Sequence, residues 1–369
     1  MINTDFICEI LGESGHAAMV AAPENRRYIT GFKSSYGVVV VTQDRDYFLT
    51  DSRYYEKAVE VVGESAVRPG KIVLTDELKE KGLKYQLEQI FVKHGITKVS
   101  VESGFMTISE LDKYKKMFPT LEFDTTSELC DIIERRRAVK TVDEVKKIQA
   151  AQNIAERAFV KLESKLKIGM SEKQVAAILN YYMLELGADS PAFDTIAASG
   201  KNSACPHATP TDKPLEYGDF LILDFGAVVD GYHSDMTRTL VMGKPTDSMK
   251  RVYDAVWSAN TDALRAVRAG ITGKLLDSVA RSTLEAWGYN DYFKHGLGHG
   301  VGLEVHESPT LSVKAESSPT LREHMVVTIE PGVYIPGKFG VRIEDMVVVT
   351  KSGCVNLTKT PKTLRRINN

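Results

Sequence analysis

A stretch in which every second residue is glycine constrains the fold of this chain most strongly. It reads HGLGHGVGLEVHE over 295–307 and holds three of the eight histidines of the chain. A helix is unfavourable over 295–303, because each glycine weakens a helix by about 1 kcal/mol relative to alanine. In an extended strand, His295 and His299 would share one face, and the glycines would leave the other face as bare backbone. We therefore predict a strand that another strand or a substrate approaches closely.

The same glycines could instead surround a phosphate, but their spacing argues against this. Phosphate-binding loops follow the patterns GxGxxG or GxxxxGK[ST] between a strand and a helix. Here the spacing is GxGxGxG, no lysine follows, and the residues beyond are strand-like. Three histidines so close together favour a role in metal binding or proton transfer.

The segment FLILDFGAVVDGYHSDMTRTL predicts a β-hairpin that carries two carboxylates. Asp230 and Gly231 separate two β-rich runs, and this dipeptide is the strongest short signal for a hairpin turn. With the turn centred there, Asp224 lies opposite Thr237, and Asp235 is the diagonal neighbour on the same face. Two carboxylates on an otherwise apolar strand are costly unless a cation compensates them. The alternative is an aspartate that caps the turn and another at the surface.

Two further carboxylates lie in VVTIEPGVYIPGKFGVRIEDMVVVT, over 326–350. Glu330 ends one apolar run and Glu344 interrupts another. The two-residue period of a strand puts Arg342 and Glu344 on one face and Asp345 on the other. A salt bridge between Glu344 and Arg342 is the alternative explanation of this pattern.

The chain divides into two parts of different character. Residues 1–125 alternate short apolar runs with amphipathic stretches, which favours a small α/β domain. The expected strands are 17–22, 37–42, 46–51, 71–76 and 98–102, and the expected helices are 81–95 and 109–117. We place the boundary near 125–135 and predict an α+β chain with domains 1–128 and 129–369.

Helical periodicity follows in residues 125–190. Ile132, Val139, Val145 and Ile148 are spaced for one helical face. The next helix is predicted to begin at the N-cap Ser171 and to stop at Gly187. Strands dominate from about 191 onward, with one pair of helices near 247–288.

Composition excludes several classes of function. The formal net charge is −2 with acids and bases interspersed, which argues against a nucleic-acid partner. The apolar runs are too short to span a membrane, and the N-terminus has no basic, apolar signal pattern. Four scattered cysteines indicate a reducing, cytoplasmic setting. Cys205 and His207 could form a cysteine-protease pair, but Pro206 between them does not align the two side chains for activation.

Five motifs, taken in order, resemble one family closely. LDFG, HSDMTR, GHGVGLEVHE, TIEPGVY and RIED are similar to the metal-binding signature of the pita-bread metallopeptidases, which include methionine aminopeptidase, aminopeptidase P and prolidase. TGFKSSYGVVVVT and TDSRYYEKA resemble the N-terminal domain of aminopeptidase P-like members. The resemblance covers essentially the whole chain. It implies a C-terminal pita-bread (creatinase/aminopeptidase-type) catalytic domain after a smaller α/β creatinase-like domain.

The resemblance implies two divalent metal ions, with Mn²⁺ expected first and Co²⁺, Zn²⁺ or Fe²⁺ as alternatives. Asp224 would bind one ion, His299 and Glu330 the other, and Asp235 and Glu344 would bridge both. A metal-bridging hydroxide would then hydrolyse the N-terminal Xaa-Pro bond of a peptide.

Four of the remaining polar side chains receive roles from the same resemblance. His306 is expected to stabilise the oxyanion and His207 to lie near the leaving group, so that both act in catalysis together with Glu330. His295 is expected to line the proline pocket, and Arg342 to orient ligands and take part in substrate binding.

The substrates implied are short peptides with proline at the second position, and the implied assembly is a homodimer. Archaeal-type prolidases tend to carry an arginine just after the HExP element, where this chain has Thr310, with Lys314 and Arg322 the nearest basic residues beyond it. This difference favours an Xaa-Pro aminopeptidase over an Xaa-Pro dipeptidase (prolidase), which is the alternative. Methionine-Xaa cleavage stays open. A catalytically silent binding protein would have lost one or more ligands, whereas all five are present.

Overall fold

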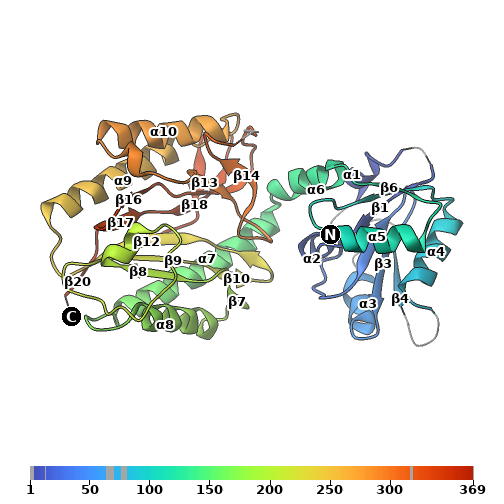
Figure 1. Cartoon of the computed structure of the whole chain (residues 1–369), viewed down its shortest axis with the longest axis horizontal. Coiled ribbons are helices and arrows are strands. Elements are labelled where there is room, and N and C mark those ends of the chain that lie inside the picture. Colours follow the sequence, from blue (N-terminus) through green and yellow to red (C-terminus); the bar gives the residue numbers. More distant parts are fainter. Residues whose placement is uncertain (1–3, 13, 64–69, 76–80, 316–318, 369) are drawn as a thin grey trace. The chain divides into compact units, whose positions relative to one another are not determined.

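The chain folds into two compact units, shown in Figure 1. The structure, a computed structural model, describes residues 4–12, 14–63, 70–75, 81–315 and 319–368. The units comprise Met1–Arg137 and Ala138–Asn369. The sequence-based boundary after residue 128 differs from this division, because it would assign nearly all of the helix Glu128–Ala138 to the second domain. That domain boundary stays a prediction. Within the described ranges, no helix is both long and apolar enough to cross a membrane.

A six-stranded sheet with helices on both faces forms the first unit. Its strands are β1 (His16–Val20), β2 (Val38–Val41), β3 (Asp46–Asp51), β4 (Gly70–Thr75), β5 (Lys98–Val101) and β6 (Glu122–Asp124). Their order is β4-β3-β2-β1-β5-β6, and β2 runs antiparallel to both neighbours. The helices are α1 (Asp5–Cys8), α2 (Pro23–Thr30), α3 (Tyr55–Gly63), α4 (Leu83–Lys93), α5 (Ile108–Met117) and α6 (Glu128–Ala138).

Alternate residues of the central strands face opposite layers. In β1, Ala17 and Met19 belong to the core that includes α4 and α5, whereas Ala18 and Val20 belong to the core on the other face, with α1, α3 and α6. The five predicted strands and two predicted helices of this region are confirmed within two residues at each end, except that Asp76 lies outside the described residues.

Helix α2 was not predicted, because PENRRYIT is mostly polar and has only two large apolar residues, Tyr28 and Ile29. Its start is stabilised from a distance in sequence. The buried carboxylate of Glu102 accepts hydrogen bonds from the backbone N–H groups of Ala21 and Ala22, the latter at 2.8 Å. Tertiary contact therefore supplies the helix-capping acceptor that the local sequence lacks.

The helical region after residue 125 consists of two helices, so the prediction of one shared apolar face is wrong. Helix α6 ends at Ala138, and α7 (Val142–Glu163) begins after Thr141. The Thr141 hydroxyl accepts from the Glu144 backbone N–H while the Glu144 side chain accepts from that of Thr141, a capping box that starts a new helix. Further on, the Ser171 N-cap is confirmed. Gly187 follows the end of that helix with a positive φ of 99°.

The second unit sandwiches several sheets between two helical pairs. Its helices are α7, α8 (Glu172–Glu185), α9 (Asp247–Ala266) and α10 (Gly273–Ala286), with short 3-10 turns η2 (Gly200–Ala204) and η3 (Asn290–Tyr292). Its strands are β7 (Ser190–Pro191), β8 (Ile196–Ser199), β9 (Phe220–Phe225), β10 (Ala227–Val229), β11 (Tyr232–His233), β12 (Met236–Met242), β13 (Gly298–Gly300), β14 (Glu307–Leu311), β15 (Val326–Ile329), β16 (Gly332–Ile335), β17 (Phe339–Arg342), β18 (Asp345–Val349), β19 (Cys354–Asn356) and β20 (Arg366–Ile367).

Two apolar cores hold these layers together. Helices α7 and α8 pack on β9 and β12, where the rings of Phe159 and Phe225 stack with centroids 5.9 Å apart. Helices α9 and α10 cover the opposite side, over β15 and β18. Figure 1 shows the strands between the two helical pairs. The largest sheets have the orders β20-β12-β9-β8 and β14-β13-β15-β18-β19.

The hairpin predicted around Asp230 and Gly231 is confirmed in its register. Both residues have positive φ angles, 47° and 75°, as a type I′ turn requires. Asp224 pairs directly with Thr237 across β9 and β12. The strands are interrupted at Gly226, where an added Cβ would lie 1.8 Å from the Ser234 carbonyl oxygen. Ser234 immediately precedes Asp235, so Asp235 lies in the break between β11 and β12.

Candidate metal centre

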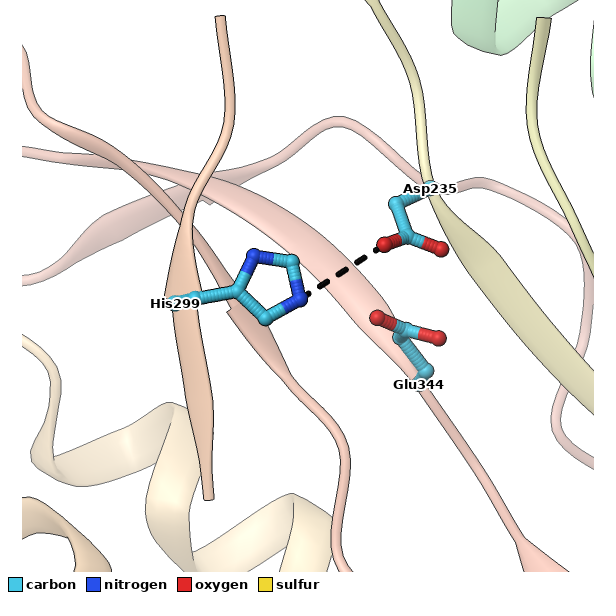
Figure 2. Close-up of side chains that lie close together, drawn as sticks. All are labelled: Asp235, His299 and Glu344. Atoms are coloured by element: carbon cyan, nitrogen blue, oxygen red, sulfur yellow. Dashed lines mark ion pairs between the residues drawn. The ribbon is translucent and has the colours of Figure 1, made fainter. Parts of the chain in front are cut away.

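Five predicted ligands converge from the two large sheets of the second unit. Asp224 lies in β9, Asp235 directly before β12, His299 in β13, Glu330 directly after β15 and Glu344 directly before β18. Figure 2 shows the closest group, in which Asp235, His299 and Glu344 point toward one another. Each of these three offers a ligand atom, and those atoms lie within 4.8 Å of one another.

Glu330 extends this group on the His299 side. His299 Nε2 lies 3.6 Å from Asp235 Oδ2 and 3.4 Å from Glu330 Oε1. His299 Nδ1 lies 3.0 Å from the Gly300 carbonyl oxygen, which can only accept. Nδ1 therefore carries the proton in the neutral ring, and the lone pair of Nε2 faces the carboxylates, as a metal ligand requires.

Several carboxylate oxygens at this centre are buried and have no hydrogen-bond donor among the residues that the structure describes. They are Asp224 Oδ1, Asp235 Oδ1 and Glu344 Oε1. The second oxygens of two of them are held, since Arg342 donates to Asp224 Oδ2 at 2.6 Å and Thr237 donates to Glu344 Oε2 at 2.7 Å. A buried anion without a partner is costly, and a cation between the carboxylates would remove this cost. The donor set therefore fits divalent metal ions.

Burial is the main reason why the pKa values of three of these acids are raised. Burial, and then repulsion from Glu344 and Asp224, raise the pKa of Asp235 well above its ordinary value. Burial, and then Glu330 and Asp224, do the same to the pKa of Glu344. Burial raises the pKa of Glu330 to about 8. Carboxylates that repel one another in this way gain most from a bound cation.

Arg342 does not form the salt bridge with Glu344 that was the alternative explanation. Its guanidinium donates to Asp224, and also to the hydroxyl of Tyr334 at 2.6 Å and that of Thr237 at 3.1 Å. Arg342 and Glu344 line the same cavity, whereas Asp345 pairs with Arg238 and Lys362. Arg342 holds the Asp224 carboxylate, and a part in substrate binding stays a prediction.

The other predicted histidines surround the same cavity. His207, His295 and His306 line a cavity of about 770 Å³ together with the five predicted ligands. The rings of His306 and His299 meet edge to face with centroids 4.3 Å apart. Burial lowers the pKa of His299 to about 4 and that of His295 to about 3, so both rings are neutral at pH 7.

Glycine is required where β13 meets its neighbours. A Cβ at Gly298 would lie 2.1 Å from the Thr328 carbonyl oxygen, and one at Gly300 would lie 2.2 Å from that of Ser308. These contacts confirm the predicted close approach by other strands. The glycines thus let β14 and β15 press against the strand that carries His299.

The sequence did not predict two residues: Tyr334 beside the centre, and Glu172, which binds the ends of the loop that carries His207. Tyr334 lies inside the quoted motif TIEPGVY, and its hydroxyl joins Arg342 to His295 Nε2 at 2.8 Å. Glu172 is fully buried, and its carboxylate accepts hydrogen bonds from residues at both ends of the loop 199–211, including Ser199 and Thr211. Glu172 follows the Ser171 N-cap and so resembles an ordinary first-turn acid. Of the two, only Tyr334 has a signal in the sequence, namely its position inside the motif TIEPGVY.

The cysteine-protease pair gains no support from this geometry. Cys205 is exposed, and among the described residues that line the cavity are Pro206 and His207 but not Cys205.

Comparison with known proteins places these features in one family. Residues 146–351 match Metallopeptidase family M24, and residues 10–139 match the Creatinase/Prolidase N-terminal domain. The chain belongs to metallopeptidase family M24. Its second unit therefore has the pita-bread fold, and the α+β architecture with a creatinase-type N-terminal domain is confirmed.

Similar proteins span nearly the whole chain. An uncharacterized peptidase of Bacillus subtilis, YqhT, is 40% identical over 96% of this chain and 97% of its own. A solved Xaa-Pro dipeptidase from Bacillus anthracis has a TM-score of 0.88 at 38% identity, covering 95% of this chain and 94% of its own. An X-Pro aminopeptidase from Thermotoga maritima has a TM-score of 0.87 at 36% identity, covering 97% and 99%.

Proposed function

We propose that this protein is a metal-dependent exopeptidase that hydrolyses the N-terminal Xaa-Pro bond of short peptides, an Xaa-Pro aminopeptidase. The observation that carries the proposal is a group of buried carboxylate oxygens beside His299, in the wall of a cavity of about 770 Å³. Within the described ranges, no hydrogen-bond donor reaches these oxygens. Such a volume lies within the range of ligand sites, roughly 300–1,000 Å³. Membership of the M24 family and the names of similar proteins support the peptidase activity.

The proposed metal site takes two divalent ions. Its ligands are Asp224, Asp235, His299, Glu330 and Glu344. Four carboxylates and one imidazole suit Mn²⁺ best, with Co²⁺, Zn²⁺ or Fe²⁺ as alternatives. When bound, such ions lower the pKa of water and polarise the scissile carbonyl.

The remaining side chains of the cavity supply orientation and proton transfer. His306 stands against His299 at the rim, where burial lowers its pKa, so its neutral ring can donate a hydrogen bond to the substrate oxyanion. His207 is exposed on the cavity wall and can protonate the departing proline nitrogen. Glu330 can take up a proton from the attacking water. His295 is held by Tyr334 and presents its ring to the cavity, where it would contact the proline.

The choice of an aminopeptidase over a dipeptidase depends on which cationic side chains line the cavity. A dipeptidase must bind the free carboxylate of the proline product, usually through a cationic side chain. Among the described residues that line the cavity, Arg342 is the only lysine or arginine, and its guanidinium is bound to Asp224. Thr310 also lines the cavity, at the place where the archaeal-type prolidases tend to carry arginine.

An Xaa-Pro dipeptidase is the second candidate, because a similar solved structure from Bacillus anthracis carries that name. A homodimer in the cytoplasm stays a prediction.

The two activities are distinguished by substrate length. With Mn²⁺ added, we expect Ala-Pro-Ala to be cleaved well and Ala-Pro slowly, measured by release of alanine. Thr310→Arg would add the missing cation, and we expect it to increase Ala-Pro turnover relative to Ala-Pro-Ala. Faster hydrolysis of Ala-Pro than of Ala-Pro-Ala by the wild-type protein would establish the dipeptidase instead. Absence of any cleavage with each of the four metals would leave only the binding role.

A further inference from the structure

A buried ion pair includes the residue that follows the histidine proposed to bind the oxyanion. Lys140 Nζ lies 2.6 Å from Glu307 Oε1, and the two side chains are 1% and 6% exposed. They are 167 residues apart in sequence. Glu307 immediately follows His306.

Lys140 is anchored at the start of the second unit. Its backbone N–H donates to the His324 carbonyl at 3.0 Å, and its Nζ also donates to the Ala138 carbonyl at 3.3 Å. Val139 forms a β-bridge with Met325, the residue before β15. The backbone at Lys140 is therefore held against the segment that leads into β15 and on to Glu330.

Glu307 lies at the base of the loop that carries His306. It pairs with Gly300 across β13 and β14, next to a shift of register between His299 and Gly300. Its carboxylate also covers Gly302, where an added Cβ would lie 2.2 Å from Glu307 Oε1. Glu307 therefore pairs with the residue before the loop 301–306, and its carboxylate packs against Gly302 inside that loop.

A buried ion pair is a weak device for stability. Desolvation of both charges offsets most of their attraction, and replacing both partners together is often neutral. Removal of one partner is costly, because the other charge stays buried alone. A pair of this kind is therefore better explained by what it positions.

We propose that Lys140 and Glu307 are positioning residues that hold His306 beside His299 for the transition state. The proposal rests on the proposed peptidase function, because His306 is assigned there to the oxyanion. Lys140 fixes the Glu307 carboxylate, Glu307 fixes the base of the loop, and the loop sets where the His306 ring stands. Since the oxyanion forms only during the reaction, misplacement of His306 lowers kcat and leaves KM nearly unchanged.

The test separates positioning from stability with a double variant. Lys140→Met removes the ammonium group that pairs with the buried Glu307 carboxylate, so we expect a lower Tm and a lower kcat. Lys140→Met with Glu307→Gln removes both charges, so we expect Tm to recover toward the wild-type value. Its kcat on Ala-Pro-Ala should stay at least about tenfold low, with KM within about twofold, because small misplacements of catalytic groups cost up to a hundredfold. Lys146→Met, which breaks an exposed ion pair with Asp143, is the control and should match wild type.

A second measurement does not depend on activity. In the metal-free protein, the imidazole NMR signal of His306, assigned with His306→Gln, should shift in the double variant and stay unchanged in Lys146→Met. A double variant with wild-type kcat, or with an unshifted His306 signal, overturns the proposal. If the wild-type protein cleaves no Xaa-Pro peptide, the proposed function fails, and the NMR comparison still decides whether the pair positions the ring.

Discussion

At the scale of single residues, the candidate metal centre is marked by buried carboxylate oxygens that have no hydrogen-bond donor in the described part of the chain. Asp235 and Glu344 each keep one such oxygen, and burial with mutual repulsion raises the pKa of both. Protein interiors rarely tolerate this arrangement unless it serves a function. The two residues therefore destabilise the metal-free protein and are expected to stabilise the metal-bound one.

Asp235→Asn tests this balance directly. It removes one negative charge from a site that repels its own carboxylates, so the metal-free variant should melt no lower than the wild type. The loss of a ligand should lower peptidase activity by more than about a hundredfold, the upper end for groups that only support ligands. Both effects are measured on one preparation, by thermal unfolding in chelator and by Ala-Pro-Ala cleavage in Mn²⁺.

The matched control is Asp212→Asn, at an exposed ion pair with Lys173. It should leave both the melting temperature and the activity unchanged. Wild-type activity in Asp235→Asn would remove Asp235 from the proposed ligands.

At the scale of elements, β13 is the strand on which the site depends. It is only three residues long, and both neighbours press on its glycines. Strand β14 begins with Glu307, and β15 ends just before Glu330. The spacing of these strands from β13 therefore sets the distance from His299 to the other groups of the centre.

Gly298→Ala should therefore damage both the fold and the site. The new Cβ would lie 2.1 Å from a backbone oxygen of Thr328, which cannot move aside as a side chain could. We expect a loss of at least about 1–3 kcal/mol in the free energy of unfolding, the range for overpacked cores. The affinity for Mn²⁺, measured by calorimetry, should fall as His299 is displaced.

Gly353→Ala provides the comparison, because nothing lies within 4 Å of its added Cβ and its φ is not positive. A change of less than about 0.5 kcal/mol is expected there. Equal stability of the two alanine variants would show that β13 tolerates a side chain on its bare face.

At the scale of the whole molecule, the buried centre links stability to pH. The pKa of Glu330 is raised to about 8, and those of Asp235 and Glu344 are raised as well. Acids of this kind contribute stability below their ordinary pKa and lose it as pH rises through the raised value. The lowered pKa values of His295 and His299 act oppositely, but only below about pH 6.5, the ordinary histidine value.

The metal-free protein should therefore become less stable between pH 6.5 and 8.5. For each acid that is protonated in the folded protein and ionised in the unfolded chain, the free energy of unfolding falls by on the order of 1 kcal/mol per pH unit. Since divalent ions displace the same protons, the rise in Tm on adding Mn²⁺ should grow over this range. Glu330→Gln should make the metal-free Tm less dependent on pH. A Tm of the chelated wild-type protein that stays constant or rises over this range would contradict the assignment.

Local patterns were sufficient for much of the fold and for a set of side chains that the structure brings to one cavity. The Asp230-Gly231 turn determined which residues face one another in β9 and β12, because a two-residue turn leaves one register for the strands that it joins. The two-residue period placed Arg342 with Glu344, and the four glycines predicted the close approach of neighbouring strands. The five motifs predicted the M24 family, which the comparisons confirm.

Contacts between distant segments were decided only by the tertiary structure. Arg342 binds Asp224 and not the nearer Glu344, and the acceptor for the start of α2 comes from Glu102. The partner of Glu307 lies 167 residues away, at Lys140. The physical reason is that turns and periodicity set the direction of a side chain along its own element. Which charged group it meets depends on how the sheets and helices pack, and the buried polar groups then take whichever partner that packing brings within hydrogen-bond distance.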